Sequence, residues 1–296
     1  MADTIPNTIA IDAGDAALDN LIKYAVAPRP ICFASTVDAA GRVNLSPFSY
    51  FNLVSHNPPV CMFSPVRRMR DGTTKHTLDN IREVPEVVIN IVDHAIVHQQ
   101  SLASTEYPKG VDEFVKAGLT AVPSGLVAPP RVAESPVQLE CRVRNVVDLG
   151  GHPGAGSVVL AEVLRMHVRQ GLLDGRGGMD QAALDAVARL GGDWYCRVGS
   201  ANLFELPKPL RRPGIGVDSL PEPIRTSAVL TGNHLAQLAN VEAIPEPLST
   251  EAVQNDPELR DVAGMATTAE VLHQRAAGLL DRGDATRAWQ VLLLGL

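Results

Sequence analysis

The chain has 296 residues, of which 45% are hydrophobic and 20% charged, an ordinary composition for a globular protein that buries a core. Its net charge of −7 argues against a surface that neutralises nucleic-acid backbones, although a few local cations could still hold a small phosphorylated cofactor. No apolar run is long enough to span a bilayer, and the acidic N-terminus lacks a signal-peptide pattern. We expect a cytoplasmic protein that binds neither nucleic acid nor membrane.

Short β runs separated by turn residues occupy positions 31 to 92. Pro47 interrupts the second run, and proline in a strand marks an edge or a bulge. The predicted elements are strands at 31–37, 43–54, 59–64 and 87–92, a hairpin turn at 38–41, and a helix over 77–84. This pattern is typical of an antiparallel sheet.

The β pattern continues to about residue 206. A short helix near 111–117 ends at Gly118, and strands follow at 137–147 and 157–168. A second short helix is predicted over 180–190, with Asp180 as its cap and Gly191–Gly192 as its end. Six or so strands with few helices predict a mainly β fold, an antiparallel barrel.

Composition changes after Leu206. A connector without regular structure is predicted from its prolines, which are Pro207, Pro209, Pro213, Pro221 and Pro223. Helices follow, with a capping box at 267–270, a stop at Gly283 and a new helix over 285–294 that begins after Asp284. We therefore expect one domain at 1–207 and an extension at 208–296 that packs on the barrel or on a partner subunit.

The sequence predicts no metal site. The four cysteines include no CxxC pair, and three lie in apolar runs where cysteine is a small buried hydrophobe: Cys32, Cys61 and Cys141. His94 and His98 could share a helix face, but neither a third ligand nor an HExxH glutamate accompanies them. We interpret both as surface histidines.

The informative segment is 28–52, PRPICFASTVDAAGRVNLSPFSYFN, followed by Pro58–Pro59 and by Lys75-His-Thr77. Here the chain resembles the flavin reductase-like family, whose pattern is S-T-V-D, a Gly-Arg turn, N-x-(S/A)-P-(F/Y)-S-x-F, Pro-Pro and K-x-T. Every element is present in order, and the likeness covers roughly residues 20–206. Its later parts are Glu140–Cys141, a histidine near 152, and Arg189-Leu-Gly-Gly192.

The resemblance implies an FMN-binding split β-barrel that pairs as a homodimer, with the cofactor at the subunit boundary. NAD(P)H is the expected co-substrate, and a small molecule or free flavin the expected partner. The glycine-rich stretch 175–178 lacks the strand and helix spacing of a dinucleotide fingerprint, and we interpret it as a turn. NAD(P)H would therefore have to reach the flavin without a Rossmann domain.

Lys75 and Thr77 stand at a predicted helix start, where a point charge, a hydroxyl and exposed N–H groups suit the FMN phosphate. Without the resemblance they would be an exposed lysine and a plain helix cap. Ser46 and Ser49 lie on the strand broken by Pro47 and could turn hydroxyls and freed amides to the cofactor. Without the resemblance, Ser46 and Ser49 would be interpreted as part of a polar loop.

Asn44 and Asn52 can each donate and accept, which suits the flavin's pyrimidine edge, although asparagine is also common in turns and caps. Alternation places Phe51 on the opposite face from Phe48 and Tyr50, so that one face is core and the other meets the ring. Either face fits the sequence.

Arg29 is held between two prolines and either reaches the phosphate or fastens the structure. His152 is the candidate catalytic residue, since a histidine can hydrogen-bond reduced flavin or transfer a proton at neutral pH. It departs from the family pattern because Pro-Gly-Ala-Gly follows it instead of the strand. The alternative is a solvated loop histidine.

Three functions are compatible with these residues. The first is an FMN-dependent oxidoreductase of the NAD(P)H:flavin reductase type, in which the flavin supplies the chemistry and no catalytic triad is needed. The second is a flavoprotein that retains FMN and oxygenates or reduces a small organic substrate, favoured by the long extension. The third is a flavin-binding module without turnover.

Overall fold

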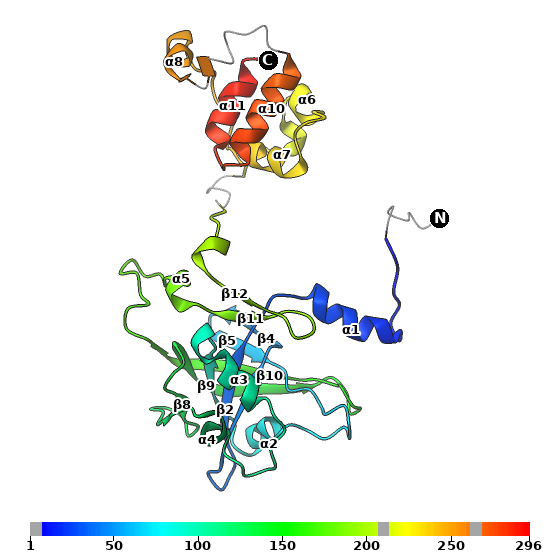
Figure 1. Ribbon diagram of the computed structural model, residues 1–296, viewed down its shortest axis with the longest axis vertical. Coiled ribbons are helices and arrows are strands. Elements are labelled where there is room, and N and C mark those ends of the chain that lie inside the picture. The colour runs from blue at the N-terminus through cyan, green and yellow to red at the C-terminus, as the bar shows by residue number, and fades with distance from the viewer. Residues whose placement is uncertain (1–7, 207–212, 258, 261–267) are drawn as a thin grey trace. The chain divides into compact units, whose positions relative to one another are not determined.

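A computed structural model describes residues 8–206, 213–257, 259–260 and 268–296 of the chain. The chain divides into two compact units, Met1–Leu203 and Phe204–Leu296. Unit 1 carries all the strands of Figure 1, and unit 2 is built from helices. The unit boundary lies four residues before the end of the predicted first domain at 207, while the assignment of the two domains stays a prediction.

Seven strands of unit 1 form one antiparallel sheet in the order β3-β2-β6-β9-β10-β5-β4. Its edge strands, β3 and β4, follow each other in the chain through only Ser49 and Tyr50. A sheet whose two edges are joined by a two-residue bend must curl until they meet, so it closes toward a barrel. The strands are β2 Cys32–Val37, β3 Val43–Phe48, β4 Phe51–His56, β5 Pro59–Phe63, β6 Glu86–Ile91, β9 Val137–Asp148 and β10 Ser157–Val168. The predicted antiparallel split barrel is confirmed.

Shorter elements surround the barrel. Two small sheets are formed by β1 Arg29–Pro30 with β11 Val187–Arg189 and β12 Tyr195–Arg197, and by β7 Ala121–Val122 with β8 Arg131–Val132. The helices are α1 Ala16–Ala25, α2 His76–Glu83, η1 His94–Ile96, α3 Val97–Ala103, α4 Glu113–Ala117, α5 Gln181–Leu184 and η2 Ser200–Asn202. Of these, α1 and α3 were not predicted from the sequence. Within the described ranges, no helix has the length and apolarity that a membrane span requires.

The barrel interior is closed by α2. Alternate residues of β2 point into it, and the rings of Phe48 and Phe63 lie 5.2 Å apart within it. Leu78 and Ile81, three residues apart on α2, are buried in the same cluster. The outer face of β2 is covered as well, because Phe33 packs in a second cluster with residues of α4 and β8.

The buried-cysteine prediction is confirmed. Cys32, Cys61 and Cys141 lie on β2, β5 and β9, where a single strand of the sheet separates β9 from each of the other two, and all three belong to the barrel core. Burial raises the pKa of each thiol above its ordinary value. These cysteines are therefore protonated packing groups at neutral pH.

Two predicted elements of unit 1 need correction. The predicted strand 43–54 is two strands, and its break lies at Ser49–Tyr50, since Pro47 pairs with Phe33 inside edge strand β3. The predicted helix 180–190 is capped by Asp180 as expected but ends at Leu184. The reason is Asp185, whose left-handed φ of 50° stops the helix. The buried residues that follow then pair as strand β11.

Unit 2 has a core of its own. Trp289 is fully buried there, and its indole N–H donates to the carbonyl of Leu238 at 3.0 Å. Asp284 caps the last helix as predicted. Pro221 and Pro223 belong to the start of a helix, so the predicted irregular connector is wrong at these positions. The helices are η3 Val217–Ser219, α6 Glu222–Arg225, α7 Gly232–Ala239, α8 Thr250–Asn255, α10 Ala269–Leu280 and α11 Ala285–Leu293.

Two details of the predicted C-terminal part lie partly or wholly outside the described residues. Residues 207–212, which include Pro207 and Pro209, are not described, and neither is Thr267 of the predicted capping box. The observed N-cap of α10 is Thr268, and its side chain makes no capping hydrogen bond.

Candidate functional site

The start of helix α2 is equipped to hold an anion. Lys75 is the N-cap residue, but its side chain makes no capping hydrogen bond. Among the described residues, the N–H groups of His76 and Thr77 have no hydrogen-bond acceptor. Unsatisfied N–H groups and the positive end of the helix dipole both favour a negative ligand here.

Three cations surround one carboxylate beside this helix start. Glu106 Oε1 lies 3.4 Å from Arg68 Nε and 3.5 Å from Lys75 Nζ, and Glu106 Oε2 lies 3.6 Å from Arg70 Nη1. All three distances are longer than a well-formed charged hydrogen bond. We call Arg68, Arg70 and Lys75 the α2 cation cluster. Its members converge on a common position without any one of them pairing tightly with Glu106.

The electrostatic effect of this cluster is visible on its neighbours. Burial lowers the pKa of His76, and the nearby positive charges of Arg68, Lys109 and Lys75 lower it further. On the same segment, hydrogen bonds from Thr73, aided by Arg70, lower the pKa of Asp71 to about 2. The region is therefore positive at neutral pH through its lysines and arginines, and His76 contributes little to that charge.

Asn44 and Thr77 lie side by side behind the cluster. Asn44 Nδ2 donates to Thr77 Oγ1 at 3.0 Å, and both side chains are buried. Ser46 is two residues further along β3, opposite Ala34, and is half-buried. The structure thus brings Asn44, Thr77 and Lys75 together at one end of β3, and Ser46 lies in the middle of the strand.

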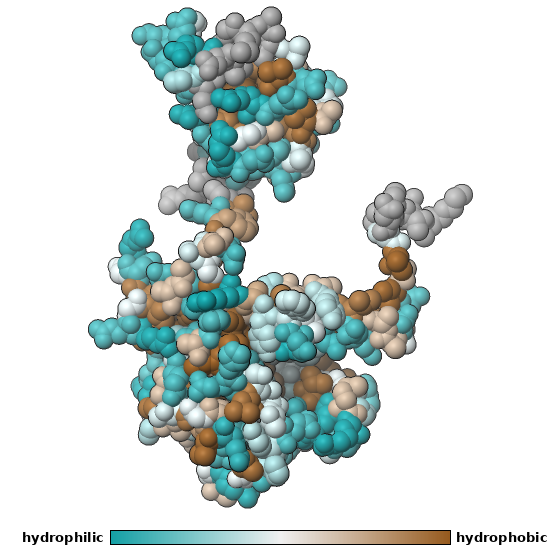
Figure 2. Space-filling view, in the orientation of Figure 1, coloured by the Kyte–Doolittle hydropathy of each residue, from teal (hydrophilic) through white to brown (hydrophobic). Residues whose placement is uncertain are grey.

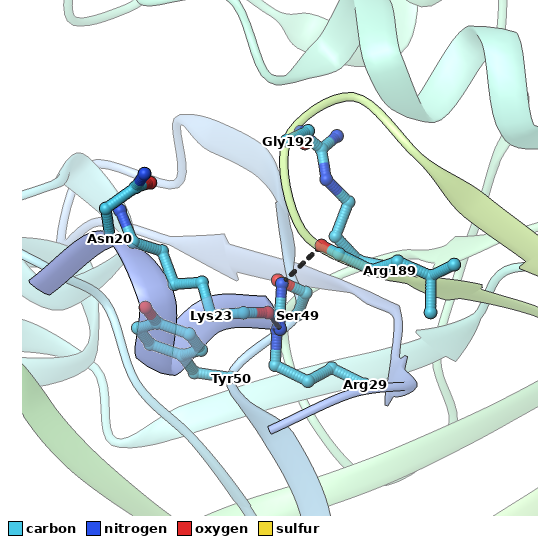
Figure 3. Close-up of a pocket in the computed structure, with 8 residues that line it drawn as sticks. Asn20, Lys23, Arg29, Ser49, Tyr50, Arg189 and Gly192 are labelled. Carbon is cyan, nitrogen blue, oxygen red and sulfur yellow. Dashed lines mark hydrogen bonds between the residues drawn. The ribbon is translucent and has the colours of Figure 1, made fainter. Parts of the chain in front are cut away.

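A cavity of about 330 Å³ lies near the opposite end of β3. Arg29 and Ser49, two of the predicted site residues, line it (Figure 3). The other lining residues are Asn20, Lys23, Tyr50, Arg189, Leu190 and Gly192. Arg29 donates to the carbonyls of Lys23, Val26 and Leu190, which fastens the C-terminal end of α1 to the loop after β11. Its guanidinium is not part of the α2 cation cluster.

Of the predicted site residues, Phe51, Asn52 and His152 join neither group. The ring of Phe51 is buried in the barrel core beside Phe48, because the bend at Ser49–Tyr50 breaks the alternation assumed from the sequence. Tyr50 is instead the aromatic residue that reaches the cavity. Asn52 is exposed on edge strand β4, and its Oδ1 accepts from the N–H of Leu53.

His152 lies in an exposed loop that is joined to the cationic segment. Its neighbour Gly154 donates from its N–H to the carbonyl of Arg67, and the N–H of Arg67 donates to the carbonyl of Ala155. The imidazole itself is exposed and lies against Gly150 of its own loop. The loop is thus next to the segment that carries Arg68 and Arg70, whereas a direct contact of the ring with the other predicted residues is not seen within residues 8–206.

Sequence reasoning missed several residues of both regions. Arg68 and Arg70 were detectable as a basic stretch shortly before Lys75. Glu106, Lys23 and the role of Arg189 carried no local signal, because these residues meet their partners only through the fold. Among the described residues, no group of three or more His, Cys, Asp or Glu side chains is arranged to hold a metal ion.

Known proteins are similar to about two thirds of this chain. A protein of Halalkalibacterium halodurans, BH2278, is 40% identical over 191 residues, which cover 64% of this chain and 90% of that protein. The nitrilotriacetate monooxygenase component B of Bacillus cereus matches with 29% identity and a TM-score of 0.62, covering 67% of this chain and 98% of that one. The 2-nitrobenzoate 2-nitroreductase NbaA of Pseudomonas fluorescens matches with 27% identity and a TM-score of 0.61, covering 71% and 100%.

A family model provides the most direct assignment. The model of the flavin reductase like domain matches residues 24–183, more than half of the chain and most of unit 1. This range contains both β3 and the start of α2, the elements on which the predicted cofactor residues lie. The chain belongs to the flavin reductase-like family.

Proposed function

We propose that this protein is an FMN-dependent oxidoreductase that takes its reducing equivalents from NAD(P)H. The observation that carries the proposal is the α2 cation cluster beside the unsatisfied N–H groups of His76 and Thr77, within a flavin reductase-like domain. Together they form a place for a doubly charged phosphate. FMN carries such a phosphate, while riboflavin does not.

The residues along β3 suit the rest of the cofactor. Asn44 lies on β3 and Ser49 in the bend just after it, five residues further on, and a strand rises roughly 3.3 Å per residue, so the polar groups from Asn44 to Ser49 extend over roughly 16 Å. Asn44 stands at the phosphate end, Ser46 in the middle, and Ser49 beside the cavity. An elongated ligand with a phosphate at one end fits this order of groups.

The protein's own residues bind and orient in this proposal. Lys75 and Arg68 hold the phosphate charge, and Asn44 fixes the buried hydroxyl of Thr77 behind them. When bound, FMN would supply the hydride-accepting chemistry. His152 stays the candidate for proton transfer, from a loop hydrogen-bonded to the cationic segment.

The test begins with the visible absorption of the purified protein, followed by anaerobic addition of NADH or NADPH. Yellow protein that either nucleotide bleaches is the expected result. Yellow protein that ignores both nucleotides would contradict the use of NAD(P)H. Colourless protein that also fails to bind added FMN would remove the central claim.

A second function is supported by the match to the solved nitroreductase. That protein, named for 2-nitrobenzoate, is matched over its whole length. By analogy, this chain would keep its flavin and reduce a small organic substrate, for which the cavity beside Ser49 and Tyr50 offers room. Oxidation of NAD(P)H that requires added free flavin supports the first function, and oxidation that requires an organic acceptor supports the second.

We also propose that the protein acts as a homodimer. Apolar side chains are exposed on α1, at Leu21 and Ile22, and on edge strand β4, at Leu53 and Val54. Figure 2 shows the brown apolar surface along α1. Edge strands and exposed apolar patches are the usual places for association. Light scattering after size exclusion should give twice the chain mass of 31.5 kDa, and a monomer mass would contradict this.

A further inference from the structure

The cavity at the end of β3 has an unusual balance of charge. Lys23, Arg29 and Arg189 line it, and none of its eight lining residues, all within the described part of unit 1, is acidic. They come from three segments that are far apart in the sequence and meet around one hollow (Figure 3). Three positive groups around one hollow create a local potential that favours an anion.

Arg29 is fixed and lacks a carboxylate partner in the described structure. Its Nη1 donates to the carbonyls of Lys23 and Val26 at 2.6 and 2.7 Å, and its Nη2 donates to Leu190 at 2.9 Å. Its Nε is buried and has no hydrogen-bond partner among the described residues. Carbonyl dipoles satisfy N–H groups without cancelling the charge, and a buried N–H without a partner is costly.

The other two cations differ in their freedom. Arg189 donates to the hydroxyl of Tyr195 and the carbonyl of Gly192, both at 2.5 Å, and its only acidic neighbour in the described structure is the fully exposed Asp193. Lys23 is exposed in the last turn of α1 and forms no ion pair with the described residues. Lys23 can therefore turn toward a ligand at little cost.

The wall formed by α1 packs against the loop after β11. The ring of Tyr24 lies so close to Gly191 that a Cβ there would come within 2.1 Å of it. Tyr50 adds an aromatic face, with the guanidinium of Arg29 5.9 Å from its ring centre. The cavity thus combines a hydroxyl from Ser49, an aromatic ring and positive charge.

We propose that this cavity binds the anionic group of a substrate that reacts with the flavin, either the carboxylate of an organic acid or a phosphate of the nicotinamide dinucleotide. Both groups present negatively charged oxygens that arginine and lysine recognise. The placement rests on the proposed function, since the cavity adjoins Ser49 at the opposite end of β3 from the α2 cation cluster. The α2 cation cluster would then hold the FMN phosphate, and the cavity would hold the anionic group of the substrate.

The test uses the full chain with the substitutions Lys23→Gln and Lys23→Glu. Lys23 accepts its hydrogen bond from Arg29 through its backbone carbonyl, so changing the Lys23 side chain leaves that hydrogen bond in place. Lys116→Gln is the matched control, since Lys116 is also an exposed lysine in the last turn of a helix. Calorimetry measures the binding of benzoate and of NADPH, with and without FMN, and FMN binding is measured separately.

We expect Lys23→Gln to weaken the binding of at least one probe about threefold and Lys23→Glu about tenfold, with FMN affinity and the Lys116→Gln control unchanged. Weaker binding of NADPH alone identifies a phosphate as the ligand group, and weaker binding of benzoate alone identifies a carboxylate. The proposal is overturned if neither probe binds, if both Lys23 variants bind like the wild type, or if the control changes equally. Failure of the wild type to bind FMN would instead count against the proposed function, because probe binding to the flavin-free protein still reports on the cavity.

Discussion

The two positively charged regions of unit 1 differ in how their charge is balanced. In the α2 cation cluster, Glu106 and Asp71 accompany the arginines and the lysine. In the cavity beside α1, Arg29 and Lys23 have no carboxylate partner among the described residues, and backbone carbonyls hold Arg29. To bind a phosphate, the first region would have to give up its contacts with Glu106, whereas the second presents its charge without a described carboxylate on Arg29 or Lys23. The number of cations therefore does not by itself decide which of the two regions is better suited to an anion.

The largest effect is expected from Arg29→Ala. This substitution removes three hydrogen bonds that join α1 to the rest of unit 1, and α1 has no buried residues of its own to keep it in place. Hydrogen bonds from a charged donor contribute a few kcal/mol together, so we expect the free energy of opening α1 to fall by about 2 kcal/mol. Amide exchange in α1 should accelerate about 30-fold, as measured by mass spectrometry.

The control for this experiment is Arg42→Ala. Arg42 pairs with Asp38 in the β2–β3 turn and forms no hydrogen bond or ion pair with the described residues of α1. Exchange in α1 should therefore stay at the wild-type rate in this variant. Unchanged exchange in Arg29→Ala as well would show that packing such as Tyr24 against Gly191, and not Arg29, holds the helix.

Lys75→Ala is the corresponding experiment for the α2 cation cluster. Lys75 contributes a positive charge at the start of α2, where the N–H groups of His76 and Thr77 have no acceptor among the described residues. Removing the Lys75 side chain should therefore weaken the binding of the FMN phosphate. We expect FMN to bind about tenfold more weakly, an effect typical of one charged hydrogen bond, with riboflavin affinity unchanged. Fluorescence titration of both flavins measures this. Equal weakening of both flavins, or of neither, would remove Lys75 from the site.

The two regions also differ in how far the sequence could predict them. Lys75 and Thr77 are two residues apart at a helix start, so local pattern was enough to place them together. The cavity depends on the hydrogen bond from Arg29 to Leu190, which joins positions 161 residues apart. No periodicity or motif connects such positions, and only the pairing of β1 with β11 brings them together.

The same distinction explains which elements were predicted. The barrel strands follow from runs of β-forming residues between turn residues, and they were placed within a few positions. The helix predicted over 180–190 failed because helical spacing does not reveal that Asp185 adopts a left-handed conformation. The ring of Phe51 was assigned to one face by alternation, which holds only while a strand continues, and the strand ends at Phe48.

The smallest effect, and one of opposite sign, is expected from Glu106→Gln. Glu106 lies at 3.4 to 3.6 Å from three cations and would compete for them with an FMN phosphate. Exposed ion pairs contribute less than about 1 kcal/mol each, so removing the charge should strengthen FMN binding by about threefold. Riboflavin should bind as before, and the exposed Glu205→Gln serves as the control for a general change in charge. If FMN instead binds more weakly, Glu106 holds the three cations in position for the phosphate, and the α2 region would then resemble the cavity in needing fixed cations more than unbalanced ones.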